Sequence, residues 1–219
     1  MNTPIWITNF KNYEQSTGQD AVELAKIHDK VARETGKSIA VVVSPLDVYR
    51  VSREVSIPVF CSHVDPIEYG SFTGHILPRL VRKSGGTGTL LNHSERRIDV
   101  ESLDAACALA QKANLRRIIC AESPAEVEQF ASLDPDFIAF EPPELIGATH
   151  ASVATAHPHS IIESVALSRN IPLLVGAGVS TLEDVRISLE LGAKGFLVAT
   201  AIVKAANPEK KLREFVSLF

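Results

Sequence analysis

Residues 171–200 read IPLLVGAGVSTLEDVRISLELGAKGFLVAT, and this stretch contains the repeating pattern that predicts the fold. Two apolar runs, 171–178 and 194–200, flank a segment at 181–192 whose apolar residues have helical spacing. Apolar runs without polar alternation are typical of strands buried on both faces, as in a parallel sheet. A threonine such as Thr181 commonly starts a helix. The stretch therefore predicts a strand, a helix and a second, parallel strand.

The same kind of apolar run occurs six more times along the chain, at 4–10, 38–44, 57–64, 87–92, 116–122 and 136–141. Helical spacing is found between most of these runs, clearly at 18–36 and 99–115 and more weakly at 45–55 and 147–160. Eight strand–helix units admit either a closed (β/α)8 barrel or an open doubly wound sheet. The count of eight favours the barrel.

No Gly/Ser/Pro-rich linker or low-complexity segment divides the 219 residues. We therefore expect an α/β protein in which residues 1–219 form a single (β/α)8 barrel domain. Barrels of this class run from roughly 200 to over 400 residues. Because this chain is near the lower end, we expect short outer helices and lean loops.

The composition excludes several classes of protein. The chain is 45% hydrophobic and 22% charged, and its formal net charge of −4 lacks the basic excess of nucleic-acid or anionic-membrane binders. No run approaches the ~20 apolar residues that span a bilayer, and the first ten residues do not resemble a signal peptide. We therefore expect no nucleic-acid or membrane partner and a cytoplasmic location.

Cysteine and histidine usage indicates neither disulfides nor a metal site. Cys61, Cys107 and Cys120 are odd in number and far apart, which is typical of a reducing compartment. The sequence HPH at 157–159, with His150 upstream, lacks the further ligand that a metal site needs. No metal ion is expected.

Polar residues follow several of the predicted strands, and the carboxyl ends of barrel strands meet at one mouth, where active sites lie. These residues are Asn9, Lys11, His93, Ser94, Glu95, Glu141, the GAG of 176–178, Ala199 and Thr200. A carboxylate base, a hydrogen-bond donor and a fixed cation suit proton transfer next to a carbonyl. Taken singly, Lys11 could be a solvated lysine, His93 a structural histidine, and Glu95 part of a surface ion-pair cluster with Arg96 and Arg97.

Several motifs, in this order, resemble the triosephosphate isomerase family and its short archaeal branch. They are NFKNY at 9–13, HSERR at 93–97, FEPPELIG at 140–147, VGAG at 175–178 and LVAT at 197–200. The resemblance covers nearly the whole chain and implies a TIM barrel. It also implies the interconversion of dihydroxyacetone phosphate and D-glyceraldehyde 3-phosphate through an enediolate, in glycolysis and gluconeogenesis, without a cofactor.

Carried over position by position, the resemblance implies that Glu141 is the base and that His93 is a neutral electrophile at the start of a short helix. Lys11 would add positive charge and be braced by Glu95, while Asn9 would orient a substrate oxygen. The phosphate would be bound by Ile146, Gly147, Gly178, Ala199 and Thr200, with Asn9 and Lys11 also contacting the substrate. A lid over about 142–152 would exclude water.

The chain departs from the family pattern at Ala148, Thr149 and His150 of the lid hinge, at Ser62 where a glutamine is common, and at Thr200 where the branch has serine. The segment 63–75 resembles the family's dimer loop, in which a threonine near Thr73 reaches toward the partner's strand-one residues, and implies a homo-oligomer, either a dimer or a tetramer. Two alternatives stay open: another phosphate-binding barrel enzyme, such as a tryptophan-pathway isomerase, and a non-catalytic binding protein.

Overall fold

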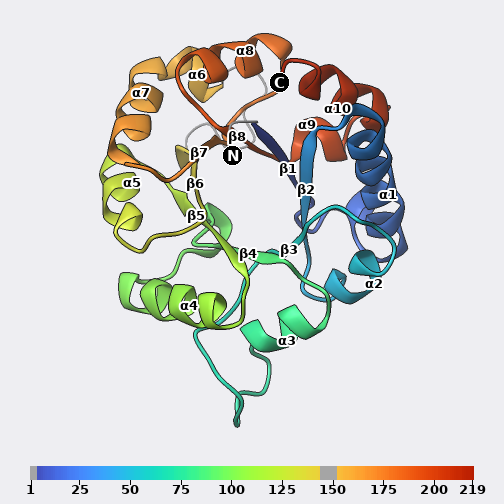
Figure 1. The fold of residues 1–219 in the computed structure, drawn as a ribbon, viewed down its shortest axis with the longest axis vertical. Helices are drawn as coiled ribbons and strands as arrows, with labels where there is room; N and C mark the ends of the chain where they lie inside the picture. The colour runs from blue at the N-terminus through green and yellow to red at the C-terminus, as the bar shows by residue number, and fades with distance from the viewer. Residues whose placement is uncertain (1–3, 144–151) are drawn as a thin grey trace.

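The structure, a computed structural model, describes residues 4–143 and 152–219. Eight strands form a closed, all-parallel barrel in which each strand pairs with the next and β8 returns to β1 (Figure 1). They are β1 (Ile5–Asn9), β2 (Ser38–Val43), β3 (Val59–Cys61), β4 (Gly88–Leu91), β5 (Arg116–Ala121), β6 (Phe137–Phe140), β7 (Leu173–Val175) and β8 (Gly195–Val198). The predicted (β/α)8 barrel is confirmed, and the open doubly wound sheet is wrong.

All eight predicted strands are present, and most are shorter than the apolar runs that predicted them. The run 171–178 contributes only Leu173–Val175 to the sheet. The chain then turns through Gly178, whose φ of 73° lies in the left-handed region that glycine adopts at little cost. The last three residues of this run, Gly176, Ala177 and Gly178, line the mouth of the barrel instead of extending β7.

The helices form a ring around the barrel (Figure 1). They are α1 (Gly18–Thr35), α2 (Val48–Ser52), α3 (Pro78–Lys83), α4 (Val100–Lys112), α5 (Pro124–Ala131), α6 (Val153–Ala156), α7 (Pro158–Leu167), α8 (Leu182–Glu190), α9 (Thr200–Val203) and α10 (Pro208–Val216), with single 3-10 turns η1 (Glu14–Ser16) and η2 (Ser94–Arg96). Most are short, as expected. The expectation is wrong for α1 and α4, which have 18 and 13 residues and bury extended apolar faces against the barrel.

Two separate apolar clusters show which way each strand residue faces. One cluster holds only strand residues from all eight strands and fills the barrel interior: Ile5, Ile7, Ala40, Val42, Phe60, Leu90, Ile118, Cys120, Phe137, Ala139, Leu174 and Leu197. The other combines the alternate strand residues with helix residues. Because strand side chains alternate between faces, Asn9 and Glu141 continue the interior rows of Ile7 and Ala139 into the mouth.

A long connection between β3 and α3 projects beyond the ring of helices, as the teal segment of Figure 1. Its base is closed where Asp65 N–H donates to the Ile76 carbonyl at 2.9 Å and Asp65 Oδ2 accepts from Ile76 N–H at 2.5 Å. The side chains of Tyr69 and Phe72 on this connection are exposed. The loops are therefore not lean throughout, and the length of the segment 63–75 in the sequence already indicates this exception.

Candidate active site

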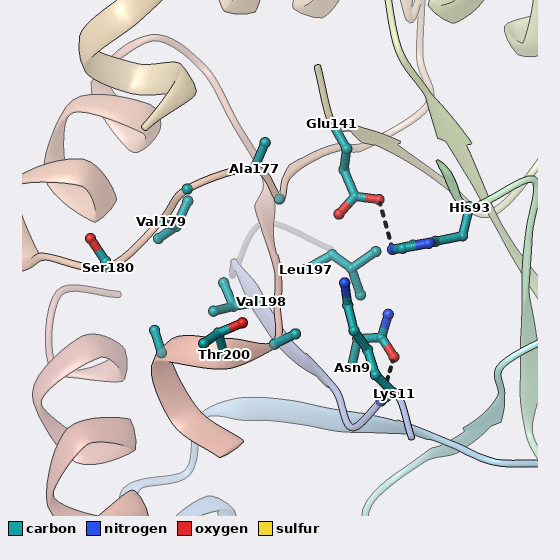
Figure 2. Close-up of a pocket in the computed structure, with 14 residues that line it drawn as sticks. Asn9, Lys11, His93, Glu141, Ala177, Val179, Ser180, Leu197, Val198 and Thr200 are labelled. Carbon is teal, nitrogen blue, oxygen red and sulfur yellow. Dashed lines mark hydrogen bonds and ion pairs between the residues drawn. The ribbon is translucent and has the colours of Figure 1, made fainter. Parts of the chain in front are cut away.

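A cavity of about 200 Å³ opens at the carboxyl ends of the strands. Figure 2 shows side chains from β1, β4 and β6 on one side of it and backbone segments after β7 and β8 on the other. Its lining consists of Asn9, Lys11, His93, Glu141, Gly176, Ala177, Gly178, Val179, Ser180, Leu197, Val198, Ala199, Thr200 and Ala201. The ionisable side chains Lys11, His93 and Glu141 therefore lie on one side of the cavity, and the segments after β7 and β8, with the hydroxyls of Ser180 and Thr200, lie on the other.

The His93 ring is oriented by the short helix that follows it. His93 is the N-cap of η2, and its Nδ1 atom accepts a hydrogen bond from the Glu95 N–H at 3.1 Å. A neutral imidazole that accepts at Nδ1 carries its proton on Nε2. Nε2 points into the cavity and lies 3.8 Å from Oε2 of Glu141 (Figure 2). The prediction that a short helix begins at Ser94 is confirmed.

Glu141 presents a desolvated carboxylate to the cavity. Its residue is 6% exposed, and its Oε2 atom is buried without a hydrogen-bond partner. A buried carboxylate oxygen without a donor is costly, and such groups in native proteins call for a functional explanation. The 3.8 Å separation from His93 Nε2 is too long for a hydrogen bond, so both atoms are available to a bound molecule.

Lys11 brings a positive charge to the same end of the cavity. Its Nζ lies 2.7 Å from Oε1 of Glu95, and its backbone N–H donates to Oδ1 of Asn9 at 3.1 Å. The φ of Lys11 is 52°, a left-handed conformation that is uncommon for a residue with a side chain. The Asn9 bond and the Glu95 ion pair together hold this strained turn in place.

The segments that follow β7 and β8 line the opposite end of the cavity, with Gly178, Ala199 and Thr200 among them. The Thr200 hydroxyl lies 3.1 Å from the hydroxyl of Tyr13, which follows β1, and Lys204 Nζ lies 4.2 Å from the centroid of the Tyr13 ring. The loops after β1 and β8 are therefore joined beside the cavity. This link was not predicted from the sequence, because 187 residues separate its two hydroxyls.

The structure brings most of the predicted site residues together. Seven of them line the cavity: Asn9, Lys11, His93, Glu141, Gly178, Ala199 and Thr200. Glu95 contacts Lys11 and lines a neighbouring cavity of about 710 Å³ that Ser62 also lines. Five predicted lid and phosphate-site residues lie outside the described residues: Ile146, Gly147, Ala148, Thr149 and His150.

Sequence reasoning missed Tyr13 and Asn92 beside the cavity, and it named Gly176 only as part of the GAG at 176–178. Gly176 packs against Glu141, Tyr13 contacts Thr200, and Asn92 precedes His93 with a φ of 59°. Tyr13 lies in NFKNY, Gly176 lies in VGAG, and Asn92 directly precedes HSERR. Their roles depend on contacts between segments distant in sequence, which the motifs alone do not specify.

The cysteines are buried and form no disulfides. Burial raises the pKa of the Cys61 thiol to about 11 and that of Cys107 to about 12, and burial together with nearby Glu141 raises the pKa of Cys120 well above its usual range.

In residues 4–143 and 152–219, no group of three or more His, Cys, Asp or Glu side chains could hold a metal ion. Nor does this described part contain a helix long and apolar enough to cross a membrane.

The family model and three curated proteins that match this chain all have the same description. The family model described as triosephosphate isomerase matches residues 4–218. The triosephosphate isomerase of Methanosarcina acetivorans is 41% identical over the full length of both chains. That of Methanobacterium bryantii is 42% identical over 98% of this chain and 96% of its own, and that of Saccharolobus solfataricus is 43% identical over 99% and 96%.

The barrel, the site at its mouth and these similarities define the class as a (β/α)8-barrel isomerase. The chain belongs to the triosephosphate isomerase family, and the predicted similarity to archaeal members is confirmed.

Proposed function

We propose that the chain interconverts dihydroxyacetone phosphate and D-glyceraldehyde 3-phosphate, with Glu141 as the base and His93 as the electrophile. The observation that carries this proposal is the pair of unbonded functional atoms, Glu141 Oε2 and His93 Nε2, which face each other across 3.8 Å inside the cavity. A carboxylate and an imidazole N–H so placed can move a proton at one carbon while stabilising charge on the adjacent oxygen.

Glu141 takes a proton from the carbon that bears the hydroxyl of dihydroxyacetone phosphate, and the electron pair of that C–H bond forms the enediolate. The proton of the hydroxyl on the first carbon moves to the oxygen of the neighbouring carbon, and the carboxylic acid returns its proton to that neighbouring carbon, which gives the aldose phosphate. No net proton or electron is gained or lost. Burial of Glu141 supports this role, because the buried site keeps water away from the carboxylate and from the reacting carbon.

His93 donates its Nε2–H to the developing enediolate oxygen. The Glu95 N–H bond to Nδ1 supports a neutral ring, because a proton on Nδ1 would face that N–H donor directly. A neutral donor stabilises the enediolate without protonating it fully. Lys11 adds a fixed positive charge on the same side of the cavity, braced by Glu95, and Asn9 orients a substrate oxygen.

The phosphate occupies the end of the cavity lined by Gly178, Ala199 and Thr200. Backbone amides and one hydroxyl suit a phosphate dianion, and barrels commonly bind phosphate after strands seven and eight. Ile146 and Gly147 are assigned to the phosphate site from the family resemblance, as is a lid over about 142–152. We place the reaction in glycolysis and gluconeogenesis in the cytoplasm.

We also propose a homo-oligomer, a dimer or a tetramer, assembled through the 63–75 loop. Tyr69 and Phe72 expose aromatic side chains on this loop. The neighbouring 710 Å³ cavity offers a recess beside Lys11 and Glu95, and Tyr13, Pro45 and Leu46 are among its lining residues. Light scattering should give more than one chain per particle, and Phe72→Asp should lower that number. Ile162→Asp, at an exposed position on α7, should leave it unchanged.

A coupled isomerase assay on the wild-type chain and on Glu141→Gln tests the proposed chemistry. The substitution keeps the size of the side chain and removes its basicity. It should lower kcat by roughly 100- to 10,000-fold, with a much smaller change in the affinity for 2-phosphoglycolate, an enediolate mimic. Glu163→Gln on α7 is the matched control. Wild-type turnover that survived in Glu141→Gln would rule out Glu141 as the base.

A further inference from the structure

His93 reaches the cavity only because the chain changes direction at the preceding residue. Leu90 belongs to the cluster inside the barrel and Leu91 to the cluster under the helices. If β4 continued with regular alternation, residue 93 would point to the same side as Leu91, away from the cavity. Asn92 has a φ of 59°, and this left-handed residue breaks the alternation. The turn at Asn92 therefore aims His93 at the mouth of the barrel.

The side chain of Asn92 is bonded at both ends and is buried, with 1% of the residue exposed. Its Nδ2 donates to the Cys120 carbonyl on β5 at 3.1 Å, and its Oδ1 accepts from the Ile98 N–H at 3.2 Å. The first bond ties the turn to the neighbouring strand. The second closes the segment 92–98, which contains His93 and η2, into a ring.

We infer that Asn92 is a positioning residue for His93, a role that rests on the proposed function of His93 as the hydrogen-bond donor. Asparagine combines two properties that few residues share. It tolerates the left-handed conformation, and its amide can donate to β5 while accepting from the chain beyond η2. Glycine supplies only the first property, and alanine supplies neither.

The side-chain amide of Asn92 acts on the imidazole ring of His93 through the backbone of η2. The Glu95 N–H that meets Nδ1 belongs to the same turn, as does the Arg96 N–H, which donates to the His93 carbonyl at 2.7 Å. If the two Asn92 bonds are removed, the Cys120 carbonyl and the Ile98 N–H lose their partner, and the turn is free to shift relative to β5. If the Glu95 N–H moves away from Nδ1, the His93 ring can rotate, so that Nε2 no longer keeps one direction. The ring can then also exchange between its two neutral tautomers.

Asn92→Gly tests the amide separately from the backbone, since glycine adopts the same φ without strain. Asn114→Gly is the matched control, because Asn114 is an exposed residue with a φ of 57° at the end of α4. For Asn92→Gly we expect kcat to fall about 10- to 100-fold, the loss that a displacement near 1 Å can cause, with KM within about twofold of the wild-type value. Asn114→Gly should match the wild type.

The second readout is the imidazole 15N spectrum of His93. The wild-type ring should show an unprotonated Nδ1 and a protonated Nε2, and Asn92→Gly should show averaging between the two tautomers. The inference is overturned if kcat of Asn92→Gly stays within twofold of the wild type. It is also overturned if kcat falls while the His93 spectrum is unchanged, since the amide would then act by another route.

A measurement on the unaltered chain covers the case in which Asn92→Gly does not fold. The side-chain amide protons of Asn92 should exchange with solvent far more slowly than those of exposed Asn114, and equal rates would contradict the inference. The two proposals fail separately. A wild-type chain without isomerase activity would refute the proposed function, whereas the tautomer and exchange data would still show whether Asn92 holds the ring.

Discussion

The carboxylate of Glu141 packs against the backbone of Gly176 so closely that a Cβ at residue 176 would lie 2.5 Å from its Oε1 atom. Gly176 follows β7, and its N–H donates to the Phe140 carbonyl at 3.3 Å, directly before Glu141. The loop after β7 thus forms one wall of the space that the proposed base occupies. Any side chain at residue 176 would compete with the carboxylate for that space.

We therefore expect Gly176→Ala to displace Glu141. A shift near 1 Å at a catalytic group can lower turnover about 100-fold, so kcat should fall by about that factor while the melting temperature changes little. Steady-state kinetics and thermal unfolding on the same preparation test this. Gly36→Ala, at a position with no atom within 4 Å of the added Cβ, is the control. It should leave kcat unchanged despite its left-handed φ of 69°. Equal kcat values for Gly176→Ala and the wild type would show that the carboxylate has room to move.

Lys11→Met should weaken the binding of anionic ligands. The substitution keeps most of the apolar stem and removes the charge beside the cavity. A charge-assisted hydrogen bond contributes roughly 1.5–3 kcal/mol, so the dissociation constant of 2-phosphoglycolate should rise about 10- to 100-fold. Titration calorimetry at low and high salt measures this dissociation constant. Lys194→Met, at an exposed position just before β8 and at the opposite end of the barrel, should bind like the wild type.

Tyr13→Phe should reduce phosphate affinity through Thr200. The substitution removes the hydroxyl that lies 3.1 Å from Thr200 Oγ1 and keeps the ring under Lys204. A hydrogen bond contributes about 1 kcal/mol, so the dissociation constant of inorganic phosphate should rise about fivefold. In a double-mutant cycle, Tyr13→Phe should have little further effect in Thr200→Val. Additive effects would mean that Tyr13 acts independently of Thr200.

Acid should destabilise the fold through His28. This residue is fully buried between α1 and β1, with Nδ1 against the Leu24 carbonyl and Nε2 against the Thr8 hydroxyl, each at 2.8 Å. Burial lowers the pKa of His28 from 6.5 to about 4, so the folded state keeps the ring neutral while the unfolded chain protonates it. The contribution of neutral His28 to the free energy of unfolding is therefore present above pH 6.5 and is lost as the pH falls towards 4. The loss is roughly 2–3 kcal/mol.

Urea unfolding of the wild type and of His28→Gln at pH 7 and pH 4.5 measures this loss. The drop in the free energy of unfolding between the two pH values should be smaller in His28→Gln than in the wild type. His159→Gln, an exposed position on α7, should behave like the wild type. Carboxylates also titrate in this range, so the comparison between variants isolates His28. An identical drop in all three proteins would contradict the prediction.

Strands and most helices could be predicted because their signals are local. Each buried parallel strand is an uninterrupted apolar run, and α1, α4 and α8 show apolar residues at helical spacing. Strand ends were less predictable, because Leu173–Val175 ends where the barrel wall ends and not where the apolar residues end. The segment between β3 and α3 was recognised in the sequence by its resemblance to the family's dimer loop, but its projection beyond the ring of helices was not predicted.

The sequence by itself determined the alternation of strands and helices and the residue types at the strand ends, including Asn9, Lys11, His93 and Glu141. Those properties depend on the spacing of residues along the chain. Only the tertiary structure decided that Gly176 confines Glu141, that Tyr13 reaches Thr200 and that Asn92 turns His93 into the cavity. The first and third of these contacts form when β6 pairs with β7 and when β4 pairs with β5, whereas the contact of Tyr13 with Thr200 forms only when β8 closes the barrel against β1.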